Sequence, residues 1–66
     1  MKADKMFEEL GYKKIIENDR KIIYRDKKFE EEIEIDLKYK MIFCLFGTDI
    51  KELQAINKKC EELGWI

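Results

Sequence analysis

The strongest structural signal in this chain is the stretch Asp49-Ile-Lys-Glu-Leu-Gln-Ala-Ile-Asn-Lys-Lys-Cys-Glu-Glu-Leu-Gly-Trp-Ile66, which predicts one amphipathic helix. Asp49 can accept hydrogen bonds from the first free amides, and Glu52 follows at the capping-box spacing. Gly64 stands where a left-handed residue commonly ends a helix. The apolar residues recur at steps of three and four and share one face: Ile50, Leu53, Ile56, Cys60 and Leu63. Because such a stripe has to be buried, we expect this helix to pack on a sheet formed by the middle of the chain.

In the middle of the chain the hydrophobic period changes to two, which predicts four strands, at residues 12–17, 20–25, 29–37 and 41–46. The third is the clearest, because four apolar residues alternate with four acidic ones: Phe29, Ile33, Ile35 and Leu37 with Glu30, Glu32, Glu34 and Asp36. The fourth is apolar in both phases, which indicates cover on both faces or an apolar patch. Short polar connections favour an antiparallel meander, since parallel neighbours need long crossovers.

A shorter helix is expected at residues 4–10, with Met6, Phe7 and Leu10 on one side and Gly11 after its end. We therefore predict a single α+β domain over residues 1–66. It is a two-layer sandwich of order αββββα, whose antiparallel meander sheet carries both helices on one face. The predicted core consists of Met6, Phe7, Leu10, Ile16, Ile22, Tyr24, Ile33, Ile35, Leu37, Phe43, Leu45, Ile50, Leu53, Ile56, Cys60 and Leu63.

Composition limits the classes of function. The 66 residues carry a net charge of −1 with 44% charged residues, so nothing in the global charge favours nucleic acid or an anionic membrane. No apolar segment has the form of a signal peptide or approaches the ~20 residues of a membrane span. We therefore expect a cytoplasmic protein that does not engage a membrane.

Chemistry-bearing constellations are also missing from the sequence. There is no His and no Ser, so a nucleophile and base pair or a zinc site lacks its usual parts. Cys44 and Cys60 lie in apolar patterns and are interpreted as reduced, buried thiols. The three glycines fall at helix ends and form no phosphate-binding loop. We expect no enzymatic activity, no metal and no cofactor.

The acidic stripe Glu30, Glu32, Glu34 and Asp36 is the most prominent polar feature. It is interpreted first as the solvated face of a half-buried strand, neutralised by Lys21 and Arg25 on the neighbouring strand. A surface that binds a protein partner is the main alternative. A cation site is disfavoured because a straight strand presents its ligands in a row, and catalysis is disfavoured because the carboxylates have like environments.

Apolar residues predicted to point away from the helices suggest where a protein partner would bind; these are Ile15, Ile23, Ile42, Cys44 and Phe46. The candidate protein-interaction site combines them with the acidic stripe: Glu30, Glu32, Glu34 and Asp36 rim Ile23, Ile42 and Cys44. Binding through this open face of the sheet or through a sheet edge is the favoured function. A homodimer through the same face is compatible with it.

The alternative function is a nucleic-acid accessory protein that uses Lys27, Lys28, Lys38, Tyr39 and Lys40. Nucleic-acid binding requires a concentrated basic face with stacking aromatics, and Tyr39 between two lysines is the only such hint. The two lysine loops are expected at opposite ends of the sheet. Solvated loops are therefore the better interpretation, and nucleic acid is the less favoured partner.

Two segments, Met6-Phe-Glu-Glu-Leu-Gly-Tyr12 and Glu52-Leu-Gln-Ala-Ile-Asn-Lys-Lys-Cys-Glu-Glu-Leu-Gly-Trp65, resemble small proteins encoded by phages, prophages and other mobile elements of low-GC Gram-positive bacteria. The resemblance covers both predicted helices and only the general layout of the strands. It implies no catalytic or binding residue. It implies an intracellular bacterial setting and, by analogy, a protein that acts by binding a host protein.

Overall fold

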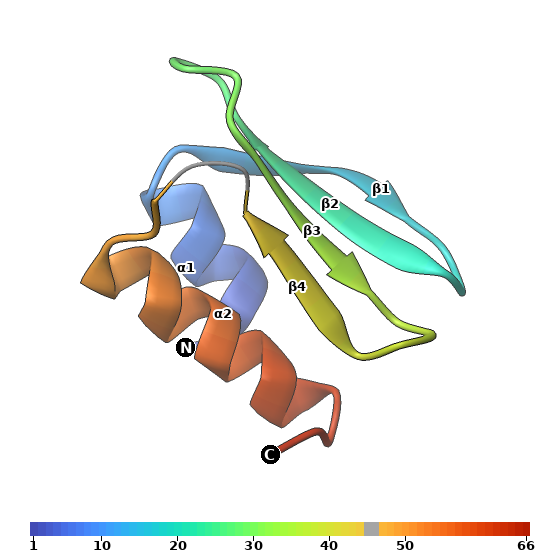
Figure 1. Cartoon of the computed structure of the whole chain (residues 1–66). Coiled ribbons are helices and arrows are strands. Elements are labelled where there is room, and N and C mark those ends of the chain that lie inside the picture. Colours follow the sequence, from blue (N-terminus) through green and yellow to red (C-terminus); the bar gives the residue numbers. More distant parts are fainter. Residues whose placement is uncertain (45–46) are drawn as a thin grey trace.

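The computed structural model describes residues 1–44 and 47–66 (Figure 1) and confirms the α+β class and the order of elements. The four strands form one antiparallel meander in the order β1-β2-β3-β4, with both helices below it in Figure 1. The elements are α1 (Ala3–Glu9), β1 (Tyr12–Glu17), β2 (Lys21–Asp26), β3 (Glu32–Asp36), β4 (Met41–Cys44) and α2 (Ile50–Glu62).

The end signals read from the sequence of α2 are present. The Asp49 carboxylate accepts a hydrogen bond from the Glu52 N–H at 2.8 Å, and Gly64 has φ +77° after the last turn. The Glu52 carboxylate accepts from the Tyr12 hydroxyl at 2.9 Å. The start of α2 is thereby joined to the start of β1, and the acidic member of the predicted capping box makes a tertiary contact.

The core lies between the sheet and the two helices. Phe7 of α1 stacks on Tyr24 of β2 with ring centroids 4.0 Å apart. Ile33 and Ile35 of β3 are fully buried beside them. Two alanines, Ala3 and Ala55, are also completely buried and allow the two helices to approach closely, which agrees with the contact between α1 and α2.

The buried stripe of α2 is rotated from the predicted one. Ile50 and Leu53 are 69% and 53% exposed, so their predicted places in the core are wrong. Ile56 is buried as predicted, and Cys60 and Leu63 pack against the core, but the helix also buries Ala55 and the stem of Lys59. The reason is that α2 packs against α1, and periodicity identifies an apolar face without saying which edge of it meets the neighbouring helix.

In β1 one apolar residue lies on the other face of the sheet from that predicted. The pairing of β1 with β2 shifts between Lys14 and Ile16, which leaves Ile15 as a bulge. Ile16 therefore lies opposite Ile23, away from the helices, and its predicted core place is wrong.

In β4 the side chains lie on the opposite faces of the sheet from those predicted. Ile42 pairs with Ile35 and Cys44 pairs with Ile33, so both lie on the helix side and not on the open face. Phe43, predicted in the core, lies on the open side and is 47% exposed. A strand that is apolar in both phases does not specify its own face, and the pairing register with β3 determines it. The predictions made for Leu45 and Phe46 fall outside the described residues.

The loop between β2 and β3 is longer than expected, because the predicted third strand loses its first residues. Phe29 is exposed in this loop instead of lying in a strand. The Asp26 N–H donates to the Glu31 carbonyl and the Glu30 N–H donates to the Asp26 carbonyl, and Glu30 has φ +57°. These hydrogen bonds form the loop, so residue 30 and the loop residues that precede it are not part of the pairing between β2 and β3.

Candidate interaction surface

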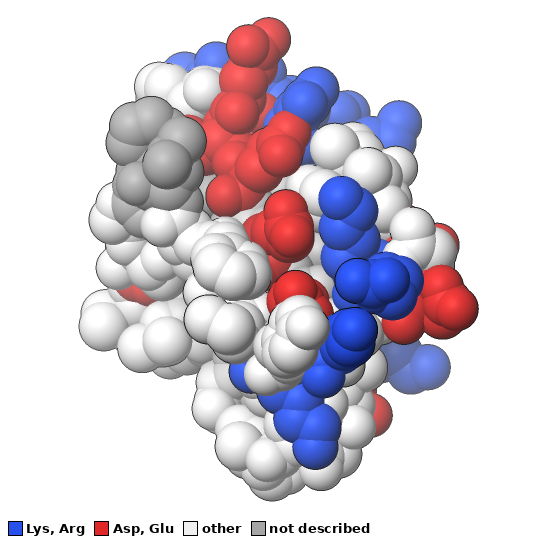
Figure 2. Space-filling view, turned by 45° about the vertical axis from the view of Figure 1, so that its right-hand side comes forward, with Lys and Arg blue, Asp and Glu red and all other residues white. Residues whose placement is uncertain are grey.

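The face of the sheet opposite the helices, here called the open face, carries the predicted acidic stripe. The strand register places three rows of side chains across it: Lys13, Arg25 and Glu32; Ile16, Ile23, Glu34 and Phe43; Lys21, Asp36 and Met41. Figure 2 shows acidic side chains gathered in a stripe beside a row of basic ones, with uncharged side chains between and beside them. The open face is therefore mixed in charge and includes an apolar row.

Cross-strand pairing neutralises part of the acidic stripe, as expected. The Arg25 Nε donates to Glu32 Oε2 at 2.9 Å, and both side chains are substantially exposed. An exposed pair of this kind contributes about 0–1 kcal/mol. Ile23 in the adjacent row is only 6% exposed, although no helix covers this face. Its neighbours on the open face therefore shield it, and Phe43 and Met41 supply the apolar surface that remains accessible.

A hollow of about 450 Å³ opens beside the acidic stripe at the end of β4. Among the described residues, pairing between β3 and β4 extends to Ile33 and Cys44, and the acidic residues before Ile33 line the hollow together with the edge strand. Its lining residues are Glu30, Glu31, Glu32, Glu34, Ile42, Phe43 and Cys44. The hollow thus has an acidic rim and an apolar wall.

Most of the predicted protein-interaction residues meet at this hollow. Glu30, Glu32 and Glu34 line it, and so do Ile42 and Cys44, although these two belong to the helix side of β4. Ile23 and Asp36 do not line it. Sequence reasoning missed Glu31, which interrupts the alternation, and Phe43, which was assigned to the wrong face of β4.

Asp36 has a local structural role. Its Oδ1 accepts from the backbone N–H groups of Lys38 and Tyr39, both at 2.9 Å, and so holds the turn between β3 and β4. Tyr39 is 64% exposed at the tip of this turn, with the Lys38 Nζ 5.3 Å from its ring centroid. The turn therefore presents an aromatic ring between two lysines.

The residues of the nucleic-acid alternative are not brought together. Lys27 and Lys28 lie in the loop between β2 and β3, whereas Lys38, Tyr39 and Lys40 lie in the turn between β3 and β4. These connections leave opposite ends of β3, which at its length of five residues separates them by about 17 Å. Between them lie the carboxylates of β3. The arrangement gives no continuous basic track for a phosphate backbone.

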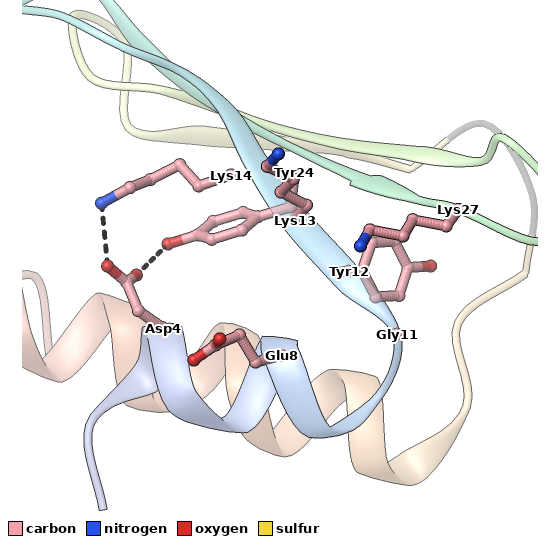
Figure 3. A pocket seen from close by; sticks show the side chains of 8 residues that line it. All are labelled: Asp4, Glu8, Gly11, Tyr12, Lys13, Lys14, Tyr24 and Lys27. Atoms are coloured by element: carbon pink, nitrogen blue, oxygen red, sulfur yellow. Dashed lines mark hydrogen bonds and ion pairs between the residues drawn. The ribbon is translucent and has the colours of Figure 1, made fainter.

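A second polar cluster, not predicted from the sequence, joins both helices to the sheet (Figure 3). The Asp4 carboxylate accepts from Lys14 Nζ at 2.8 Å and from the Tyr24 hydroxyl at 2.5 Å, as Figure 3 shows. Lys59 Nζ of α2 lies 3.4 Å from the same carboxylate. Asp4 stands in the first turn of α1, so one carboxylate connects β1, β2 and α2 to that helix.

The ionisation of Asp4 reflects these partners. Burial acts to raise the pKa of Asp4, but the hydrogen bonds from Lys14 and Tyr24 and the charge of Lys59 outweigh it and lower the pKa to about 2. Burial and the hydrogen bond to Asp4 raise the pKa of Tyr24. A carboxylate held ionised by three donors is suited to binding the elements together and is poorly suited to proton transfer near neutral pH.

The hollow beside this cluster has a volume of about 480 Å³. It is lined by Asp4, Glu8, Gly11, Tyr12, Lys13, Lys14, Tyr24 and Lys27. Its charged groups are of both signs, and the most buried of them are already paired with each other. No sequence signal indicated it, because its lining residues come from α1, β1, β2 and the segments next to them, which only the fold brings together.

Two further observations concern the part of the chain that the structure describes. Residues 1–44 and 47–66 contain no group of three or more potential metal ligands. Within the same ranges, neither helix has the length and apolar character that crossing a membrane requires.

Comparison of the chain with family models, with curated proteins and with solved structures finds no match in any of the three.

Proposed function

We propose that this chain is a non-enzymatic protein-interaction module that binds a partner protein at the acidic hollow and the adjoining open face. The observation that carries the proposal is the composition of the hollow, in which carboxylates rim an apolar wall that includes the exposed ring of Phe43. Apolar contact area with charged groups at its margin is the common composition of a protein–protein interface.

The chemistry of the hollow defines the partner segment. Four glutamates favour a segment with Lys or Arg, and the apolar wall favours an aromatic or aliphatic side chain between those charges. Such a segment would align its charges with the rim and bury its apolar group against β4. The proposal places this protein in the cytoplasm of a bacterium and gives it a mobile-element origin, as the resemblance of its two helices implies.

The nucleic-acid alternative has weaker support. Its two lysine groups lie at opposite ends of β3, and the carboxylates between them would repel a phosphate backbone. That alternative predicts binding that falls steeply as salt rises. A fluorescent single-stranded oligonucleotide titrated at two salt concentrations would test it, and tight, salt-sensitive binding would move the function to nucleic acid.

Affinity capture with a charge-reversed variant tests the proposed function. The tagged chain is incubated with a lysate of a low-GC Gram-positive bacterium, with nuclease and at low and high salt, and captured proteins are identified by mass spectrometry. We expect a partner that the wild type retains and the double variant Glu32→Lys, Glu34→Lys loses. The matched control is Glu8→Lys, Glu9→Lys, which makes the same charge change on exposed positions of α1. Equal capture by both double variants would contradict a role for the acidic hollow.

A further inference from the structure

The outer edge of β4 is open to pairing with another strand. In the described sheet β4 pairs with β3 alone, so the backbone groups on its other side are not used by the meander. The four residues of β4 are uncharged and include neither Pro nor Gly. Edge strands of natural proteins are commonly protected from pairing with another chain by a short length, a charge, a bulge or a Pro. Of these devices β4 has only its length of four residues, so its outer backbone groups remain a template for a further strand.

The geometry of strand pairing restricts how a second copy could occupy this edge. A two-fold axis perpendicular to the sheet pairs β4 with its own copy in antiparallel fashion and keeps the helices of both copies on the same side. Residues directly opposite each other must then share a face. Phe43 therefore meets either Phe43 or Met41 of the second copy on the open face, and both of these side chains are exposed in the single chain.

The charges along β4 are complementary under the same two-fold axis. The end of β4 at Cys44 adjoins the acidic hollow, whereas the end at Met41 follows the turn that carries Lys38 and Lys40. Antiparallel pairing brings the turn of one copy to the Cys44 end of β4 in the other copy, which is the end at which the hollow lies, and the symmetry repeats this arrangement. Parallel pairing would instead place the acidic ends of the two β4 strands next to each other.

The turn also matches the hollow in polarity. Tyr39 presents an exposed ring between Lys38 and Lys40, and the hollow presents an apolar wall between glutamates. Lys40 has φ +56°, a left-handed conformation that completes the turn directly before β4. The two groups of residues that sequence analysis assigned to competing functions are thus complementary in charge.

We propose that the chain forms a two-fold symmetric homodimer in which β4 pairs antiparallel with β4 of the second copy, and the turn Lys38-Tyr39-Lys40 of each copy enters the acidic hollow of the other. The result is a continuous eight-stranded sheet with its four helices on one side. This inference rests on the proposed function, since it names a second copy of this chain as the partner of the hollow.

Charge exchange tests this arrangement. The acid-reversed variant carries Glu30→Lys and Glu34→Lys, and the base-reversed variant carries Lys38→Glu and Lys40→Glu. We expect sedimentation equilibrium to find the wild type as a dimer, and each variant with a dissociation constant raised about 100-fold or more, since like charges now face each other. An equimolar mixture of the two variants should form a heterodimer, because both contacts are again between opposite charges. Circular dichroism of each variant checks that it is folded.

The outcomes separate this inference from the proposed function. A wild type that stays monomeric up to millimolar concentration overturns the homodimer, and a capture experiment that still retains a foreign protein then leaves the proposed function standing. A dimer that neither variant weakens, or folded variants that do not recover association when mixed, overturns the turn-in-hollow contact. Dimerisation with recovery in the mixture supports it, even where no foreign protein is captured.

Discussion

The two edges of the sheet are built differently. The β1 edge carries a bulge at Ile15, and Lys14 there makes ion pairs with Asp4 at 2.8 Å and with Glu17 at 2.7 Å. The β4 edge is a short, regular, uncharged strand. Bulges and lysines are the usual means of preventing a further strand from pairing. The contrast is that the β1 edge has a bulge and a paired lysine that oppose further strand pairing, whereas the β4 edge has only its short length.

The largest effect is expected from a charge placed in the core on β3, the strand that pairs with β4. Ile35 is completely buried and pairs with Ile42 of β4. Ile35→Asp should unfold the domain, because an unpaired buried carboxylate costs more than the few kcal/mol that a small domain has available. Thermal unfolding followed by circular dichroism measures this. Glu34→Ala, one position away on the open face, should keep the wild-type transition, and similar midpoints for the two variants would contradict the assignment of faces in β3.

The second effect concerns the β4 edge itself. Phe43→Lys supplies the charge that the β1 edge already has, so it should abolish association through β4 while leaving the fold intact, since Phe43 is half exposed. Gel filtration with light scattering at several concentrations gives the mass. Phe29→Lys is the matched control, as it makes the same change at an exposed ring in the loop between β2 and β3. A control variant that also loses association would show that Phe43 has no particular part in it.

The third effect concerns the polar cluster on the β1 side. Asp4→Asn should destabilise the domain by about 1 kcal/mol at pH 7, because hydrogen bonds to a half-exposed charged group lose strength when the charge is removed. Urea unfolding of the variant and the wild type measures the difference. Asp19→Asn, in the exposed turn between β1 and β2, removes the same charge and should change stability little.

The same pair of proteins yields a pH prediction. The pKa of Asp4 is about 2 in the folded chain, below its ordinary value of 3.8, so ionised Asp4 stabilises the fold. This contribution is fully present above about pH 4 and is lost as the pH falls through about 2. The stability difference between the wild type and Asp4→Asn should therefore shrink between pH 4 and pH 2. A difference that stays constant over this range would contradict the ion pairing of Asp4.

The smallest effect is expected from the exposed ion pair on the open face. A double-mutant cycle with Arg25→Ala and Glu32→Ala should find a coupling of about 0.2–1 kcal/mol, since water and salt screen both groups. Urea unfolding of the four proteins provides the values. A coupling well above this range would mean that the pair is shielded from solvent, as it would be inside an interface.

Local signals identified most of the elements. The Asp49 cap, the left-handed Gly64 and the alternation of Ile33 and Ile35 with acidic residues were read correctly, because each depends on residues close in sequence. Three of the four acidic residues of the hollow, Glu30, Glu32 and Glu34, were also predicted from that alternation, whereas Glu31 was not. The face of Ile16 was predicted incorrectly because it depends on a bulge in the pairing with β2, and the faces of residues 42–44 because they depend on the register with β3. The predictions for Phe29, Ile50 and Leu53, all of which are exposed, were also wrong.

The sequence alone established the class, the order of the elements and the ends of α2, since hydrophobic period and capping residues act over a few positions. Only the tertiary structure decided which side of β4 faces the helices, that Asp4 contacts Lys14, Tyr24 and Lys59, and that an acidic hollow and a basic turn lie at opposite ends of β4. These properties depend on register and on contacts between residues far apart in the chain, and no local pattern specifies them.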